Sequence, residues 1–275
     1  MALTLYCEMI NLARAQERRR HMTAELSKAG ISAKFFPAFD YKENGAEAML
    51  EHCRVTGPWG PFHTNNMAIT ISHAQVWERF LETGDDLCLV MEDDVFLSPE
   101  LSDWLNDLSW WPQNADIVKI DRWDSPSLKV LMQQAIGRHK GRSIQRILSR
   151  HVGAAGYILT RKAARQFLAQ KPFNITIDNL LFNFNASPAA RRMQVYQVAP
   201  ALIVQGNEPP DQAVNTGVRL RPKGLSLISQ KLKRAYYEIA YPLPIIFQAL
   251  TGKAKLAQIP YEPYAESQTS ASPKD

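Results

Sequence analysis

Cysteine is scarce in this 275-residue sequence, which contains only Cys7, Cys53 and Cys88. Three cysteines cannot all pair and none forms a CxxC spacing, so a fully paired disulfide framework is excluded. Cys7 and Cys88 lie in apolar runs, where a free thiol packs as a small hydrophobic side chain. This use of cysteine favours a reducing compartment.

Targeting and membrane-spanning segments are also lacking. The N-terminus has neither a basic region nor a long apolar region, so no signal peptide is expected. No apolar run approaches the roughly 20 residues of a membrane-spanning helix. Internal repeats are absent as well. The sequence therefore predicts a cytoplasmic protein.

Positive charge is concentrated near the C-terminus of a chain whose net charge is +5. The segment from Arg219 to Lys255 contains eight Lys and Arg residues and only one acid, Glu238. An aromatic, apolar stretch at 236–247 lies among them. Two interpretations stay open: an anionic membrane surface at the inner membrane, or a solvated basic face beside core residues. Nucleic acid is not expected as a partner, because no recognised motif accompanies the charge.

The first forty residues alternate between strand and helix patterns. An apolar run at 3–12 predicts a buried strand, residues 14–28 predict a helix ending at Gly30, and residues 31–39 predict a second strand. This order is typical of an α/β unit with parallel pairing. Further along, the patterns predict a helix and loop at 41–66, helices at 68–81 and 161–169, strands at 87–91, 117–120, 154–159 and 193–204, and a mobile basic connection at 138–150.

An acidic triplet, Glu92-Asp93-Asp94, follows the apolar run 87–91 directly. Adjacent carboxylates at the end of a buried strand repel one another unless a cation joins them. In extended backbone Glu92 and Asp94 point the same way and can share one Mg²⁺ or Mn²⁺ ion. Open α/β sheets bind ligands at this end of their strands. The alternative is a solvated acidic turn, such as Asp85-Asp86 just upstream.

A cation at the triplet would stabilise the charge that develops on a leaving diphosphate. Attack by a hydroxyl group then requires a carboxylate base elsewhere in the chain. Asp121 and Asp178 are the candidates, and each could instead be a helix cap or turn aspartate. A metal-dependent phosphohydrolase or nuclease would use the same triplet and stays open as an alternative.

Several motifs occur in an order that resembles glycosyltransferase family 25, the bacterial lipooligosaccharide galactosyltransferases and their collagen-modifying relatives. The resemblance covers about residues 5–205. The matching segments are Ile10-Asn11-Leu12 with Arg18-Arg19 and Met22, Pro37-Ala38-Phe39-Asp40, Ser72-His73 with Trp77, Leu89 to Val95, Gly153 to Ile158 with Ala163-Ala164, and Ile177-Asp178 followed by Val195 to Pro200.

The resemblance implies a GT-A-like α/β fold, which we expect over residues 1–218. The change of composition from about residue 219 predicts a basic, partly apolar extension at 219–275 that is disordered from Glu266 onward. The resemblance also implies an inverting transfer of a hexose, galactose by default, from a UDP-sugar to a saccharide or lipid-linked saccharide acceptor. Mn²⁺ or Mg²⁺ would be held mainly by Asp94, with Glu92 or Asp93 assisting. Asp178 becomes the preferred base. The residues implied near the donor nucleotide are Asn11, Arg18, Arg19, Asp40, Glu92 and Asp93.

Other side chains near these motifs have weaker interpretations. Trp123 follows a predicted strand and could stack on an acceptor sugar. His73 is a second candidate for contact with the acceptor, and it is otherwise expected to lie behind the site or in the core. Arg18 and Arg19 could simply form the wet face of a helix. Asn66 replaces the acid of the family's usual E-i-G-C motif, which leaves a non-catalytic saccharide-binding homologue as a further alternative. The basic stretch at 138–150 could shape an acceptor groove.

Overall fold

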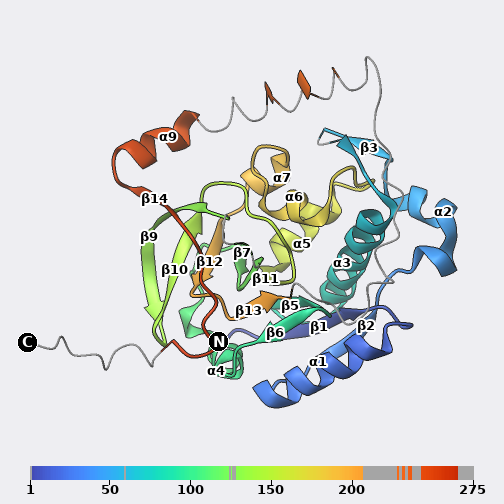
Figure 1. Cartoon of the computed structure of the whole chain (residues 1–275), viewed down its shortest axis with the longest axis horizontal. Coiled ribbons are helices and arrows are strands. Elements are labelled where there is room, and N and C mark those ends of the chain that lie inside the picture. The colour runs from blue at the N-terminus through green and yellow to red at the C-terminus, as the bar shows by residue number, and fades with distance from the viewer. Residues whose placement is uncertain are drawn as a thin grey trace, which may run out of the picture.

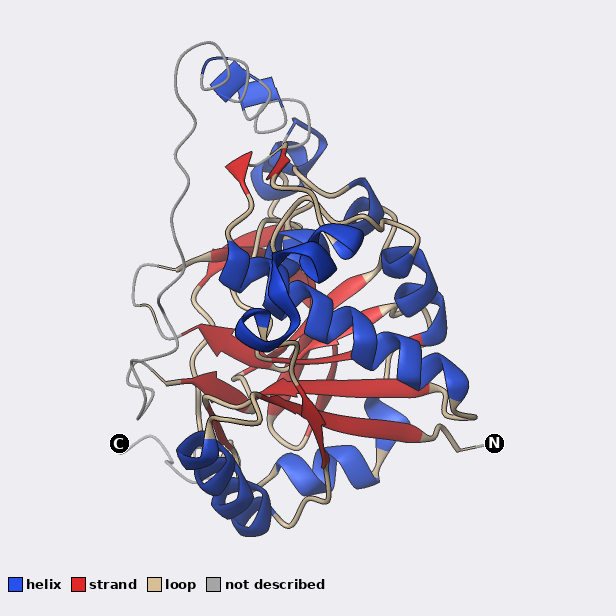
Figure 2. Cartoon of the chain, turned by 90° about the vertical axis from the view of Figure 1, so that its right-hand side faces the viewer, coloured by secondary structure: helices blue, strands red, loops and turns tan. Residues whose placement is uncertain are grey.

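The computed structural model describes residues 2–58, 60–123, 125, 128–206, 228, 231–232, 235–236 and 243–265. Nine strands form one open mixed sheet, in the order β14-β9-β10-β12-β7-β11-β5-β1-β2, with helices on both faces (Figures 1 and 2). These strands are β1 (Leu5–Asn11), β2 (Lys34–Pro37), β5 (Leu87–Glu92), β7 (Ile117–Lys119), β9 (Val130–His139), β10 (Arg142–Ile147), β11 (Gly156–Thr160), β12 (Val195–Ala199) and β14 (Ala254–Ala257). This architecture confirms the predicted GT-A-like α/β class.

The helices follow the predicted pattern closely at the N-terminal end. The first of them, α1, ends at Gly30, whose φ of 66° lets its backbone N–H reach the carbonyls of Leu26 and Ser27. The helices are α1 (Gln16–Ala29), α2 (Tyr41–His52), α3 (Thr64–Glu82), α4 (Leu101–Asn106), the 3₁₀ turn η1 (Leu108–Trp110), α5 (Arg161–Leu168), α6 (Ile177–Phe182), α7 (Pro188–Arg191) and α9 (Leu243–Leu250). None of those in the described ranges is long and apolar enough to cross a bilayer.

Strand β5 is buried on both of its faces. Leu89 and its neighbours two residues away belong to the core cluster beneath α1 and α4, whereas Cys88 and Val90 belong to the cluster beneath α3, α5 and α6. Parallel pairing with β1 and antiparallel pairing with β11 saturate its backbone on both sides. Because β5 is packed on both faces and paired on both sides, the position of Glu92 at its carboxyl end is well defined.

A second sheet, of three strands, lies at the carboxyl end of β5. Its order is β6 (Val95–Leu97), β13 (Ile203–Gln205), β8 (Asp121–Trp123). The single strand predicted over 193–204 is therefore two strands in different sheets, separated at Pro200. The register of β13 places Gln205 opposite both Val95 and Trp123. A third sheet, of two strands, is formed by β3 (Thr56–Gly57) and β4 (Gly60–Pro61).

The mobile connection predicted at 138–150 is wrong, because most of this segment is a β-hairpin of β9 and β10. Lys140 and Gly141, with φ of 42° and 76°, form the turn that joins the two strands. Arg142 is fully buried and donates to Glu100 Oε2 at 2.6 Å and to the carbonyl of Ala201 at 2.9 Å. One of the basic residues of this segment therefore forms a buried ion pair and is not part of a solvated loop.

Part of the predicted C-terminal extension belongs to the main sheet. Strand β14 pairs antiparallel with β9, and Ala201 forms an isolated bridge with Tyr261. The backbone N–H of Ala265 donates to Glu100 at 3.0 Å. The boundary predicted at residue 218 and the disordered end predicted from Glu266 both lie outside the described residues.

Candidate functional site

A cavity of about 600 Å³ opens where β5, β8 and β13 end. The start of α3, the start of α6 and the loop 152–154 complete its wall. Six of the residues singled out in the sequence line it: Arg18, Asn66, Glu92, Asp94, Trp123 and Asp178. A larger cavity of about 820 Å³ lies beside β3 and α7, and no acidic side chain is among its described lining residues.

The triplet divides as strand alternation predicts. Glu92 and Asp94 line the cavity, whereas Asp93 is buried and turned toward α1. Asp93 accepts hydrogen bonds from Asn11 Nδ2 at 2.7 Å and from Arg18 Nη1 at 2.8 Å. Its role in the structure is to hold Arg18 at the cavity wall, where Nη1 also lies 3.7 Å from Asp94 Oδ2.

Gln205 joins the two carboxylates that face the cavity. Its Nε2 donates to Asp94 Oδ1 and Oδ2, at 3.0 and 3.1 Å, and approaches Glu92 Oε2 at 3.4 Å. The sequence reasoning did not identify this residue. The only signal in the sequence was a polar side chain closing the apolar run 201–204, and its position became clear only from the register of β13.

Negative charge is only partly compensated at this point. Burial and the neighbouring charge of Glu92 raise the pKa of Asp94 to about 7, although Gln205 and Arg18 act in the opposite direction. A divalent cation would relieve this repulsion, and carboxylate oxygens are the ligands that Mg²⁺ and Mn²⁺ prefer. No cluster of three or more His, Cys, Asp or Glu side chains that could hold a metal occurs in the described ranges. The residues present therefore fit a cation held by two carboxylates, with further oxygens from other groups.

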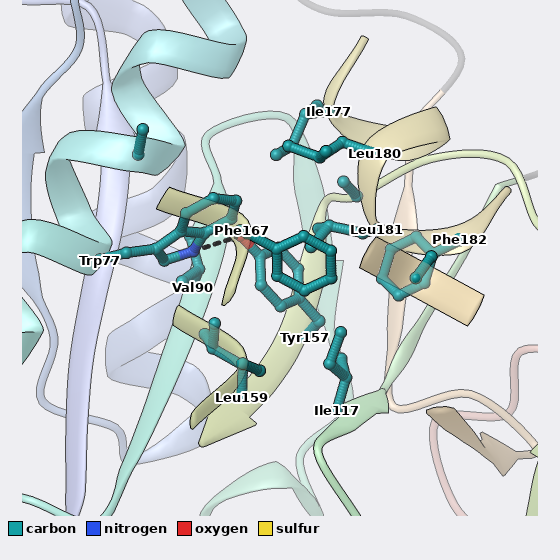
Figure 3. Close-up of a cluster of buried hydrophobic side chains, with 14 of the residues drawn as sticks. Trp77, Val90, Ile117, Tyr157, Leu159, Phe167, Ile177, Leu180, Leu181 and Phe182 are labelled. Atoms are coloured by element: carbon teal, nitrogen blue, oxygen red, sulfur yellow. Dashed lines mark hydrogen bonds between the residues drawn. The ribbon is translucent and has the colours of Figure 1, made fainter. Parts of the chain in front are cut away.

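A chain of hydrogen bonds within the core reaches Glu92 from behind, and Figure 3 shows its first bond, between Trp77 and Tyr157. Trp77 Nε1 donates to the hydroxyl oxygen of Tyr157 at 3.0 Å, and that hydroxyl lies 2.8 Å from His73 Nδ1. Indole N–H is only a donor, so the Tyr157 hydroxyl is free to donate to His73 Nδ1. His73 Nε2 then carries the proton and donates to Glu92 Oε1 at 3.2 Å. His73 is fully buried and does not line the cavity, so it orients Glu92 and is not placed to touch an acceptor.

Asp178 enters the cavity from the first turn of α6. Its Oδ1 accepts from the Thr176 hydroxyl and from Asn179 Nδ2, the latter at 3.3 Å. No side chain in the described ranges donates to its Oδ2, which leaves that oxygen available to a ligand. The Asp178 carboxylate is thus oriented by the bonds to Oδ1, while Oδ2 can accept a hydrogen bond from a ligand in the cavity.

Asp121, the other candidate base, is fully buried and lies outside the cavity lining. It pairs with Lys119 Nζ at 2.5 Å, and the same nitrogen donates to the carbonyl of Gly153 at 2.9 Å. Burial raises the pKa of Asp121, and Lys119 opposes this shift. The structure therefore places Asp121 in an internal ion pair that supports the loop 152–154 beneath the cavity.

The residues expected near the nucleotide divide into two groups. Asp40 caps α2 by accepting from the backbone N–H of Lys42 at 3.0 Å, and it is paired with Arg14. Burial alone would raise the pKa of Asp40, but the bonds from Arg14 and Lys42 hold it below its usual value. Asp40 lines a small cavity of about 90 Å³. Ile69 lines both this cavity and the cavity of about 600 Å³ that contains Glu92 and Asp94. Arg19 instead stacks over the ring of Phe35 at 4.3 Å and lines neither cavity.

Two further positions flank the carboxylates. Trp123 is 40% exposed at the end of β8, so part of its ring is accessible from the cavity. Helix α3 begins four residues before the predicted start, which puts Asn66 in its first turn and on the cavity wall. The position at which the sequence departs from the family motif therefore borders the site.

Comparison with known proteins gives one family. The family described as Glycosyltransferase family 25 (LPS biosynthesis protein) matches residues 7–181. The lacto-N-neotetraose biosynthesis glycosyltransferase LgtE of Neisseria gonorrhoeae is 32% identical over 205 residues, which cover 72% of each chain. The lipooligosaccharide biosynthesis protein lic2B of Haemophilus influenzae is 25% identical over 264 residues, which cover 90% of this chain and 91% of that protein. The matched range includes the triplet and Asp178 but ends before Gln205.

Proposed function

Because this chain belongs to glycosyltransferase family 25, and is thus a glycosyltransferase, we propose that it moves a hexose from a UDP-sugar to a saccharide acceptor with inversion. Galactose is the default sugar implied by the sequence resemblance. Lipooligosaccharide or lipopolysaccharide biosynthesis is the proposed process, as the names of the family and of its relatives suggest. The observation that carries this proposal is the pair Glu92 and Asp94, which share one cavity with Asp178.

The donor half of the cavity is formed by β5 and α1. A Mn²⁺ or Mg²⁺ ion at Glu92 and Asp94 would neutralise the diphosphate as it leaves. Arg18 is held beside Asp94 by Asp93, so its guanidinium is positioned to bind phosphate oxygens. The small cavity beside Asp40 is the proposed place of part of the nucleoside, because it shares Ile69 with the cavity of the carboxylates and is lined mainly by apolar side chains, together with Arg14 and Asn65.

The acceptor half is formed by α6 and the end of β8. Asp178 presents one free carboxylate oxygen, which would accept the proton of the attacking sugar hydroxyl. A single displacement needs a base on the acceptor side, and Asp178 approaches from a different element than the carboxylate pair. The exposed ring of Trp123 offers a flat apolar face on which a sugar ring can stack.

We also propose that the acceptor is lipid-linked and that α9 and β14 rest on an anionic membrane surface. Phe247, Leu250 and Leu256 expose 66, 81 and 61% of their surface. Lys253 and Lys255 lie between them, and residues 243–257 contain no acid. Apolar side chains with flanking lysines suit the interface of an anionic bilayer. The alternative is that the lysines only solvate this edge of the sheet.

Two other functions stay distinguishable by experiment. A phosphohydrolase with this triplet would cleave phosphate esters, and a non-catalytic homologue would bind saccharide without turnover. The test is release of UDP from a panel of UDP-sugars with a saccharide acceptor, in Mn²⁺ or in EDTA. We expect turnover of one UDP-sugar, dependent on Mn²⁺ and lost in Asp94→Ala. Cleavage of phosphate esters, or no turnover of any UDP-sugar, would contradict the proposed function.

A further inference from the structure

Gln205 occupies the point at which the two carboxylates of the cavity converge. We propose that Gln205 is a third protein ligand of the divalent cation, binding it through the side-chain oxygen Oε1. The inference rests on the proposed function, because it requires that a cation binds at Glu92 and Asp94. It adds a residue from β13, about 110 positions away along the chain, to a site predicted only at the end of β5.

The contacts of Nε2 locate this point. One amide nitrogen lies within 3.4 Å of three carboxylate oxygens that belong to Asp94 and Glu92. Their negative potential is therefore concentrated at the end of the Gln205 side chain. The oxygen and nitrogen of a side-chain amide have nearly the same size, so a half-turn of the amide exchanges them. After that turn Oε1 lies where Nε2 lies in the structure, beside both carboxylates.

The backbone holds Gln205 in this place. β13 lies between β6 and β8, so Gln205 pairs on both sides at the end of the strand. The next residue, Gly206, donates its backbone N–H to the carbonyl of Asp94 at 2.9 Å. A Cβ on Gly206 would lie 2.9 Å from the Phe96 ring, so a larger residue here would have to displace that ring. These backbone bonds hold the main chain of Gln205 beside the triplet, within reach of its side-chain amide.

The half-turn costs no hydrogen bond at Oε1. No side chain in the part of the chain that the structure describes donates to this oxygen. It borders the space at Gly153, where an added Cβ would be 3.7 Å from both Gln205 Oε1 and Asp121 Oδ2. Asp121 Oδ2 is buried and has no hydrogen-bond partner among the described residues. The amide nitrogen would therefore turn toward a space bordered by an unsatisfied acceptor.

The chemistry of the ligand set supports the assignment. Two carboxylates neutralise a divalent ion, and an amide oxygen completes three protein ligands without adding charge. Octahedral Mn²⁺ or Mg²⁺ then retains positions for diphosphate oxygens and water.

The test measures Mn²⁺ binding to the full-length protein in the presence of UDP, from the electron paramagnetic resonance signal of free Mn²⁺. We expect Gln205→Ala and the similarly sized Gln205→Met to weaken Mn²⁺ binding by about tenfold or more, as loss of a group that supports a metal does. Gln205→Glu is expected to retain binding, because it keeps an oxygen at the same position. Gln170→Ala is the matched control, because among the described residues its amide bonds only the backbone carbonyl of Gln166.

Unchanged or tighter Mn²⁺ binding in Gln205→Ala or Gln205→Met would overturn the assignment, since Gln205 would then only compete with the ion for Asp94 and Glu92. Absence of Mn²⁺ binding in the unsubstituted protein would instead overturn the proposed function itself, and this inference with it. Comparable melting temperatures of the variants and Gln170→Ala confirm that each has folded. The two failures are thus separated by one series of measurements.

Discussion

Asp94 lines the cavity beside Glu92, and its side chain is largely removed from solvent. Its ionised form is disfavoured in the folded protein, because burial and Glu92 raise its pKa to about 7 from an ordinary value near 4. The folded state therefore binds a proton more tightly than the unfolded state. The resulting penalty is absent below about pH 4, grows as the pH rises, and is complete above about pH 7.

The first prediction follows from this loss of stability with rising pH. In metal-free buffer with EDTA, Asp94→Asn should be more stable than the unsubstituted protein at pH 8, because it removes the buried charge. The difference in free energy of unfolding should shrink as the pH falls to 5. Urea unfolding of both proteins at the two pH values measures it. A difference that stays constant with pH would show that Asp94 is not held in its neutral form.

The second prediction concerns Asp178, whose free Oδ2 is the proposed acceptor of the proton. Asp178→Asn should lower kcat by about 10²–10⁴-fold, the usual contribution of general base catalysis. Binding of UDP with Mn²⁺ should be unchanged, because Asp178 does not contact the carboxylate pair. Steady-state kinetics and UDP titration of the same preparation check both parts. Near-complete kcat in the folded variant would exclude Asp178 as the base.

Asp121 provides the contrast at the same scale. It is fully buried against Lys119 and does not reach the cavity. Asp121→Asn should therefore lower the free energy of unfolding by about 3–5 kcal/mol, since it leaves a buried lysine without its counter-charge. Equilibrium unfolding in urea measures this. A stable variant that has lost only kcat would return Asp121 to the list of candidate bases.

At the scale of elements, the hairpin of β9 and β10 shows how a buried charge can join distant segments. Arg142 donates to Glu100, to the carbonyl of Ala201 and to the carbonyl of Glu262. These bonds connect α4, the turn before β13 and the C-terminal segment. The arginine thereby supports the turn that leads into Gln205.

The third prediction tests this connection. Arg142→Ala should lower the free energy of unfolding by about 3–5 kcal/mol, because Glu100 and several backbone carbonyls lose a buried donor. Arg138→Ala in the same hairpin is the control, since Arg138 is exposed and contacts the carbonyl of Gly141. Its effect should stay within about 0.5 kcal/mol. Equal effects of the two substitutions in urea unfolding would contradict the internal role of Arg142.

Elements with clear hydrophobic patterns could be predicted from the sequence, and elements formed by polar residues could not. The apolar run ending at Met91 fixed β5, and strand alternation gave the opposite directions of Glu92 and Asp93. The hairpin 130–147 was missed because its basic residues mask an alternation of buried positions such as Ile144. Gln205 was missed because its role depends on the register of β13 between two strands far away in sequence. Long-range pairing of this kind leaves no local signal.

At the scale of the whole molecule, the C-terminal chain returns to the edge of the sheet as α9 and β14 (Figure 1). Antiparallel pairing with β9 fixes β14 there, and Gln248 of α9 accepts from Gln133 of β9 at 2.8 Å. The exposed apolar side chains and the two lysines are therefore presented on a framework tied to the catalytic sheet. This arrangement is consistent with the membrane surface proposed above.

The fourth prediction concerns this surface. The protein should sediment with vesicles that contain anionic lipid and not with neutral vesicles, and binding should weaken at high salt. Lys253→Ala with Lys255→Ala should cost about 2 kcal/mol of binding free energy, at about 1 kcal/mol for each lysine. Phe247→Ser should weaken binding further, whereas Leu50→Ser, an exposed apolar residue of α2, should not. Equal sedimentation with both kinds of vesicle would contradict the proposed surface.

The most direct test of the whole account is a calorimetric titration of UDP into the protein, in Mn²⁺ and in EDTA. We predict that heat of association appears in Mn²⁺, is absent in EDTA, and is lost in Asp94→Ala. Such a result would follow from a cation held by Glu92 and Asp94 that binds the diphosphate. No heat in Mn²⁺, or equal heat with and without the metal, would contradict the central claim.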